Sequence, residues 1–128
     1  MKELSNFLAS LKLSNFQIND HLYHHNTKLI DKTAQFLLRK NFIKNIYYKN
    51  KYICVTLEYI NGQSAIKEIE IFSSTSNKKT AKFNELLNFY LKSKSSGYTY
   101  VVSTSIGILT LEECLLYHVG GLIIFKIK

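Results

Sequence analysis

The sequence predicts an α+β protein of two small lobes: an N-terminal α-β-α-β-β lobe with an antiparallel sheet, residues 1–73, and a C-terminal mixed lobe with short strands and short helices, residues 74–128. Three observations support this. Apolar residues alternate between the 3.6-residue period of helices and the two-residue period of strands. Residues 73–79 have no periodicity and many turn formers, which indicates a linker. The 128 residues suffice for one compact domain or two small lobes.

The N-terminal half begins with a helical stripe. Its apolar members are Leu4, Phe7, Leu8 and Leu11. Their spacing predicts a first helix of about three turns. Residues 21–25 are expected to be extended, and Asn26 or Thr27 can cap a second helix that continues to about Asn41, since a short polar side chain accepts a bond from a first-turn amide.

From about Asn45 onward the helical period ends, and successive side chains alternate between two faces, as in a strand. One face of the predicted strand carries Ile53, Val55, Leu57 and Tyr59, and the other carries Tyr52, Cys54, Thr56 and Glu58. Asn61-Gly62 favours a type I′ hairpin turn, because this pair tolerates positive φ at both central positions. The return strand is expected to span residues 65–72.

The C-terminal half is expected to contain a helix, a strand, a short helix and a closing strand. Phe83, Leu86, Leu87 and Tyr90 mark the first helix, and residues 92–97 an exposed loop. Residues 98–102 read as a strand. Thr110 and Glu113 fit a capping box that opens a helix to about residue 118, which Gly120-Gly121 would end. Residues 122–127 are an apolar run suited to a buried strand.

Composition narrows the functional classes. The chain has 17 Lys and Arg against 9 Asp and Glu, a formal net charge of +8, which attracts polyanions. Of these 17 residues only Arg39 is arginine, and proline is absent, as expected of a gene from a very AT-rich genome, organellar or bacterial. No apolar run is long enough for a membrane span. Cys54 and Cys114 form neither a disulfide framework nor a zinc pattern, which favours a reducing compartment.

Catalytic and metal-binding patterns are weak. His24 and His25 are adjacent on a predicted strand and therefore point to opposite faces, with no Cys or Asp at ligand spacing. Ser103, Glu113 and His118 could be drawn as a triad, but no Gly-x-Ser-x-Gly elbow fixes their geometry. No glycine-rich phosphate loop is present. We therefore expect no enzymatic activity, no metal, no cofactor and no small-molecule substrate.

Three hydroxyl residues follow the predicted strand at 98–102. Ser103, Thr104 and Ser105, with Gly107 shortly after, would form a turn whose hydroxyls and amides face outward. Such groups can bond to phosphates, 2′-hydroxyls and base edges. A plain structural turn is the competing interpretation.

The wider pattern resembles the family of small-subunit ribosomal protein number eight, over nearly the whole chain. The most specific part is residues 101–110, an apolar pair, Ser-Thr-Ser, any residue, Gly, another apolar pair and a helix-starting residue. Val119-Gly120-Gly121 and a closing apolar strand follow at the family's spacing. Upstream, residues 36–43 resemble the family's helix ending in Gly-Phe-Ile, and residues 57–62 its central hairpin.

The resemblance implies a two-lobed structural constituent of the small ribosomal subunit. It would bind the central domain of small-subunit rRNA and support assembly and translation, beside neighbouring ribosomal proteins. The residues it points to for RNA binding are Ser103, Thr104, Ser105, Gly107, Gly120, Gly121, Lys12, Lys28 and Lys32. A simpler explanation of the two adjacent glycines is that they end a helix and lead into a strand. A simpler explanation of each lysine is that it is a solvated surface group.

The sequence is compatible with two other functions and indicates a cellular location. A basic protein-interaction module without specific RNA binding is the rival, and a hydrolase built on Ser103 and His118 is more distant. The composition favours a mitochondrial ribosome in the matrix, with plastid stroma or the cytoplasm of an AT-rich bacterium as alternatives. Organellar synthesis would fit the start of the chain, which has no signal-peptide or transit-peptide pattern.

Overall fold

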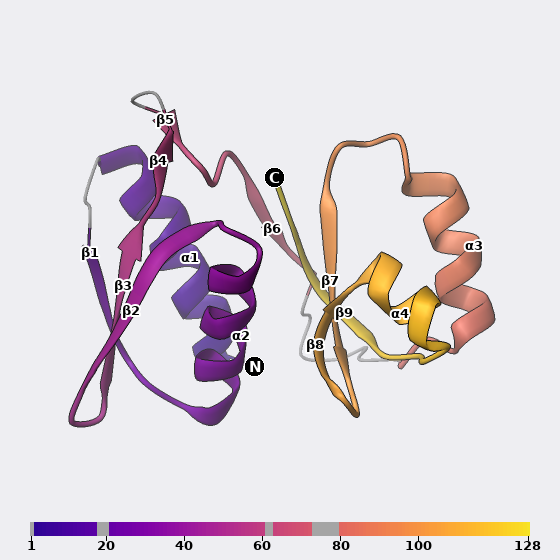
Figure 1. Ribbon diagram of the computed structural model, residues 1–128, viewed down its shortest axis with the longest axis horizontal. Coiled ribbons are helices and arrows are strands. Elements are labelled where there is room, and N and C mark those ends of the chain that lie inside the picture. Colours follow the sequence, from indigo (N-terminus) through magenta and orange to yellow (C-terminus); the bar gives the residue numbers. More distant parts are fainter. Residues whose placement is uncertain (1, 18–20, 61–62, 73–79) are drawn as a thin grey trace. The chain divides into compact units, whose positions relative to one another are not determined.

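The computed structural model describes residues 2–17, 21–60, 63–72 and 80–128. The chain divides into two compact units, Met1–Ile69 and Glu70–Lys128 (Figure 1). Each combines helices with an antiparallel sheet, so the predicted α+β class is confirmed. No helix in the described ranges is long and apolar enough to cross a membrane.

Two helices form one layer of the first unit. Helix α1 spans Lys2–Gln17 and continues past Leu11, so it is longer than the predicted three turns. Elongation adds one backbone hydrogen bond per residue and does not depend on the apolar stripe continuing. Helix α2 spans Lys28–Arg39 and is capped by Thr27, whose hydroxyl accepts from the Ile30 amide at 3.3 Å. It ends before Asn41, which adopts a left-handed φ of 64°.

A three-stranded antiparallel sheet forms the other layer, with the order β1-β3-β2. Strand β1 is His21–His25, β2 is Ile43–Lys49 and β3 is Tyr52–Leu57. The β2–β3 hairpin closes near Asn50, whose φ of 55° suits a tight turn. Helix α1 packs on β1 and α2 on β2. The core of this unit includes Leu4, Phe7, Leu8, Leu11, Ile30, Leu37, Ile53 and Val55.

The predicted return strand over residues 65–72 is correct only for Ile69–Ile71, and its expected pairing with the preceding strand is wrong. Within the described residues, strand β4, Tyr59–Ile60, pairs with β5, Gln63–Ser64, alone, and the Asn61-Gly62 turn lies outside them. The ladder stops because the Ser64 hydroxyl accepts from the Ile66 amide at 3.2 Å and turns the chain. Strand β6, Ile69–Ile71, joins the second sheet instead, and the break between units follows Ile69, whereas we expected it after residue 73.

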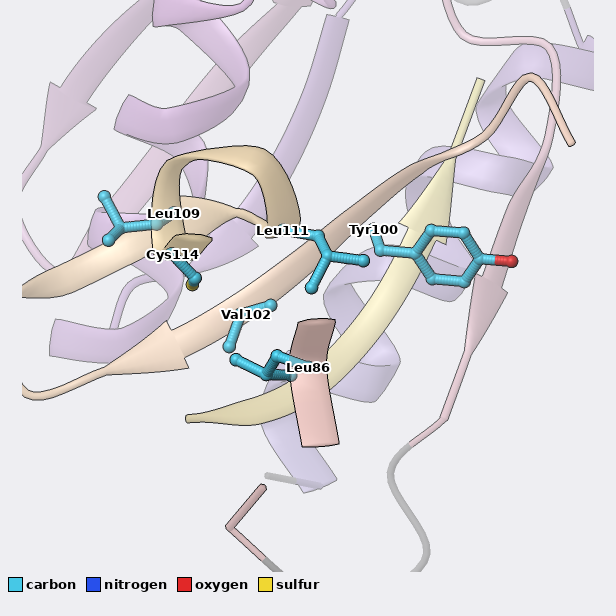
Figure 2. Packing of buried hydrophobic residues seen from close by; sticks show 6 residues of the cluster. All are labelled: Leu86, Tyr100, Val102, Leu109, Leu111 and Cys114. Carbon is cyan, nitrogen blue, oxygen red and sulfur yellow. The ribbon is translucent and has the colours of Figure 1, made fainter. Parts of the chain in front are cut away.

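The second unit packs two helices on a sheet with the order β6-β9-β7-β8. Strands β7, β8 and β9 span Thr99–Thr104, Gly107–Thr110 and Leu122–Ile127, and helices α3 and α4 span Phe83–Ser93 and Leu111–Tyr117. Figure 2 shows the core between them, formed by Leu86, Tyr100, Val102, Leu109, Leu111 and Cys114. Both cysteines are buried and free, Cys54 on β3 and Cys114 on α4, as the sequence predicted.

Candidate nucleic-acid interface

The β7–β8 hairpin presents the hydroxyl residues. Ser103 pairs with Ile108 and Thr104 with Gly107 in the ladder, so the turn itself contains only Ser105 and Ile106. The expectation that all three hydroxyl residues lie in a turn is therefore wrong for Ser103 and Thr104. Gly107 has a φ of 134°, which only glycine adopts without strain, and this conformation lets the ladder continue up to a two-residue turn.

The three hydroxyls have different tasks. The Thr104 hydroxyl donates to the Gly107 carbonyl at 2.7 Å and accepts from the Ile106 amide at 3.2 Å, so it fixes the turn. Ser103 is half-buried and Ser105 is exposed. Within the described part of the chain, neither serine hydroxyl has a hydrogen-bond partner. Ser103 and Ser105 are therefore the hydroxyls that an external ligand can use.

Gly120 and Gly121 bring a second backbone segment to the same place. The Ala81 amide donates to the Gly121 carbonyl at 2.7 Å, and the Gly121 amide donates to the Ala81 carbonyl at 2.9 Å. A Cβ on Gly120 would lie 2.4 Å from the Ala81 carbonyl oxygen, and one on Gly121 would lie 2.6 Å from that of Ser103. Close backbone approach explains both glycines. They do not terminate α4, which ends at Tyr117 and is followed by His118 with a left-handed φ of 56°.

An open hollow of about 540 Å³ lies between these segments. Its lining consists of Thr80, Ala81, Lys82, Phe83, Ser103, Thr104, Ser105, Gly120 and Gly121. Among the described residues that line it, Lys82 is the one cation and none is a carboxylate, so this lining favours an anionic or hydrogen-bonding ligand. The sequence reasoning missed residues 80–83. Lys82 could have indicated this part of the site, because it follows the basic pair at 78–79 and directly precedes a predicted helix.

The hollow gathers five of the nine predicted RNA-binding residues: Ser103, Thr104, Ser105, Gly120 and Gly121. Gly107 lies opposite Thr104 in the hairpin and is not part of the lining; a Cβ there would meet no protein atom within 4 Å. The predicted lysines belong to the first unit. Lys12 is exposed on α1, and Lys28 and Lys32 are exposed one turn apart on α2.

Catalytic geometry is not assembled around Ser103. The Glu113 carboxylate accepts from the Thr110 amide at 2.9 Å and thereby caps α4, as predicted, while the His118 ring stacks on Phe83 with centroids 4.7 Å apart. Among the described residues no hydrogen bond joins Ser103 to His118. Burial, together with the charges of Glu113 and Glu112, raises the pKa of the Cys114 thiol to about 11, so this group stays neutral and unreactive at physiological pH.

No metal centre is visible in the ranges that the structure covers. No three His, Cys, Asp or Glu side chains gather there as a ligand set. His24 contacts the Phe7 ring edge-on, whereas His21 and His25 lie on the opposite face of the sheet.

Comparison with known proteins decides the family. Residues 2–127 match the model of the family described as ribosomal protein S8. The chain belongs to the ribosomal protein S8 family. It is 31% identical over 129 residues, covering the whole of both chains, to the small ribosomal subunit protein uS8m of Acanthamoeba castellanii. It is also 37% identical over 95 residues to the small ribosomal subunit protein uS8 of Carsonella ruddii (strain PV), covering 71% of this chain and 68% of that relative.

Membership of the S8 family confirms the resemblance that was based on several sequence motifs in the family's order. It makes the chain a structural constituent of the small ribosomal subunit. The match extends through both units and includes the stretches at residues 36–43, 57–62 and 101–110.

Proposed function

We propose that this S8 protein binds the central domain of small-subunit rRNA through the hollow of its second unit, and so supports assembly and translation. One observation carries the proposal: the hydroxyls of Ser103 and Ser105 have no partner within the described chain, and both line a carboxylate-free hollow beside a lysine. Polar groups placed in this way match the 2′-hydroxyls, phosphates and base edges of an irregular RNA helix.

Each lining group has a distinct part in binding. Ser103 and Ser105 exchange hydrogen bonds with base edges and sugar hydroxyls, and Lys82 positions a phosphate. Thr104 keeps the turn in shape, and Gly107 leaves open space in which an RNA backbone can approach. The Gly120-Gly121 segment places its own backbone beside them through the bridge to Ala81. No step of this function requires a reaction, a metal or a cofactor.

Lysines of the first unit supply positioning contacts. Lys12, Lys28 and Lys32 are exposed, and none has an ion-pair partner among the described residues. Such contacts to phosphates release counterions and strengthen binding to every RNA sequence by a similar factor. They hold the protein on the RNA while the hollow of the second unit discriminates between sites.

The location we propose is the mitochondrial ribosome, in the matrix. The relative that aligns over its whole length bears a mitochondrial name, and the lysine-rich, proline-free composition fits an AT-rich organellar gene. Neighbouring small-subunit proteins would be its further partners. The alternative locations are the cytoplasm of an AT-rich bacterium, which the similarity to a bacterial relative supports, and the plastid stroma.

Salt titration of binding to a central-domain rRNA fragment tests the function. The affinity should fall steeply with rising salt, and Lys28→Ala should reduce both the affinity and the slope of its logarithm, by about one unit per lost phosphate contact. Lys92→Ala, which removes an exposed lysine of α3 outside the hollow, is the matched control. Salt-independent binding, or weak RNA binding beside tight binding to a protein, would favour the protein-interaction module.

A further inference from the structure

The first unit has a sheet face that no helix of that unit covers. Helices α1 and α2 pack on the side where Leu22, Ile46 and Val55 lie. The register of the three strands places nine residues on the opposite side, in three cross-strand rows: His21, Thr56 and Asn45; Tyr23, Cys54 and Tyr47; His25, Tyr52 and Lys49. These nine residues are called the open face below.

Contacts between the side chains confirm this placement. Thr56 Oγ1 lies 3.3 Å from His21 Nδ1, and Asn45 Nδ2 donates to Tyr47 Oη at 3.0 Å. The rings of His25 and Tyr52 meet edge to face with centroids 5.8 Å apart. These contacts link neighbouring positions on the same face of the sheet.

Exposed aromatic rings dominate the open face. Tyr23, Tyr47 and Tyr52 are 68%, 57% and 53% exposed, so three large rings on one small sheet face are accessible to a ligand. The face has no aliphatic side chain among its nine positions, because the Leu, Ile and Val residues of these strands point toward the helices or belong to the core. The open face therefore presents aromatic rings with polar hydroxyls rather than an aliphatic hydrophobic patch.

The charged side chains on the three strands are all lysines. Glu58 directly follows β3, and its carboxylate accepts from the Tyr59 amide at 3.2 Å. Strands β1, β2 and β3 and the turn between β2 and β3 contain Lys44, Lys49 and Lys51 and three histidines, and no Asp or Glu. Asp31 of α2 lies on the other side, where its carboxylate accepts a hydrogen bond from the Tyr48 hydroxyl. An anionic partner therefore meets no acidic side chain on the three strands that carry the open face.

We propose that the open face is a stacking platform for unpaired bases of RNA. Rings spaced across adjacent strands and flanked by lysines give each base a π surface and each phosphate a cation. Base-paired RNA does not offer its base faces, and a hydrophobic protein partner would find no aliphatic side chains, so single-stranded RNA fits best. This inference rests on the proposed function in that it places the protein on rRNA, yet it uses a different unit and different residues.

Fluorescence and affinity measurements on the full chain test the platform, using single-stranded oligouridine of about ten nucleotides, a length in the range of known single-strand sites. The variants are Tyr23→Ala, Tyr47→Ala and Tyr52→Ala, singly and combined, and the matching Tyr→Phe changes, which keep the ring. Tyr48→Ala is the control, since Tyr48 is 52% exposed on the same strand as Tyr47 but faces the helix side. Circular dichroism confirms that each variant folds.

Each alanine change should weaken oligouridine binding on the order of fivefold or more, corresponding to about 1 kcal/mol or more per stacked base. The phenylalanine variants and Tyr48→Ala should bind like the wild type. Equal binding by all folded variants, or equal loss with Tyr48→Ala, overturns the platform. The same holds if the alanine variants keep their RNA affinity and instead lose a protein neighbour.

A second arm separates this inference from the function proposed for the hollow. Ser103→Ala with Ser105→Ala should leave oligouridine binding by the open face unchanged while weakening binding to the central-domain fragment. If the serine variant binds that fragment normally but the tyrosine variants lose oligouridine, the platform stands and the hollow fails. The reverse pattern leaves the hollow and removes the platform.

Discussion

Replacing Gly121 by alanine should destabilise the second unit and disrupt the hollow. The added Cβ would lie 2.6 Å from the Ser103 carbonyl oxygen and 2.7 Å from Val102 Cγ1, whereas ordinary contact begins near 3.4 Å. Strands β7 and β9 would have to separate by roughly 0.8 Å at a point where backbone, not a flexible side chain, blocks the methyl group. Overpacking of this kind costs about 1–3 kcal/mol, and we expect the upper half of that range.

Thermal denaturation followed by circular dichroism measures this cost. For a chain of this size about 2 kcal/mol corresponds to a fall in Tm of roughly 8 °C. Gly97→Ala is the control, because a Cβ there meets no atom within 4 Å and only the φ of 81° resists substitution. A Tm for Gly121→Ala equal to or above that of Gly97→Ala would refute close packing of the two strands at this point.

Three further predictions concern single groups of the second unit. Thr104→Val should cost about 1–2 kcal/mol of folding stability in urea denaturation, because the turn loses both bonds of its hydroxyl; an unchanged midpoint would contradict that role. Thr110→Ala should cost about 1 kcal/mol and reduce helicity, since its hydroxyl accepts from the Glu113 amide at 3.1 Å, and stability equal to wild type would exclude the cap. The pKa of Cys114 is about 11 in the folded protein against 9.0 ordinarily, so its contribution to stability is complete below pH 9 and is lost as the pH rises from 9 through 11. Thiolate absorbance should show Cys114 ionising near pH 11, and ionisation near pH 9 in the folded protein would disprove the effect of burial.

Local patterns in the sequence predicted most elements of the fold. The cap of α2 was narrowed to Asn26 or Thr27, and the structure selects Thr27, while the capping box of Thr110 and Glu113 was recognised from its spacing. The closing strand was evident from its apolar run. The fate of residues 65–72 was not predictable in this way. Ile69 and Ile71 alternate with acidic residues equally well in either sheet, and the choice of β9 as partner depends on contacts distant in sequence.

The candidate site shows the same division between local and distant signals. The motif around Ser103 pointed to the hairpin, but the distinction between Thr104, which is engaged, and the two serines, which are not, needed the hydrogen-bond geometry. Gly120-Gly121 resembled a helix end in sequence. Glycine is needed there because the backbone pairs closely with Ala81, a partner some forty residues earlier that no local pattern indicates.

Rings on the open face were visible in sequence only as part of a strand. The alternation of Tyr52 and Cys54 with Ile53 and Val55 marked two faces of the strand, but it did not show which of them the helices cover. The cross-strand neighbours Tyr23 and Tyr47 became evident only through the register of β1 and β2 with β3.

The most direct test of the central claim is the affinity of the Ser103→Ala, Ser105→Ala double variant for the central-domain rRNA fragment, measured beside its Tm. Each lost hydroxyl contact should cost about 0.5–1.5 kcal/mol of binding, so the affinity of the double variant should fall by about fivefold to about 150-fold. The Tm should stay close to that of the wild type, since neither hydroxyl has a partner within the described chain. Affinity for an unrelated duplex should hardly change. Undiminished affinity for the cognate fragment, or an equal loss for both RNAs, would contradict recognition through this hairpin.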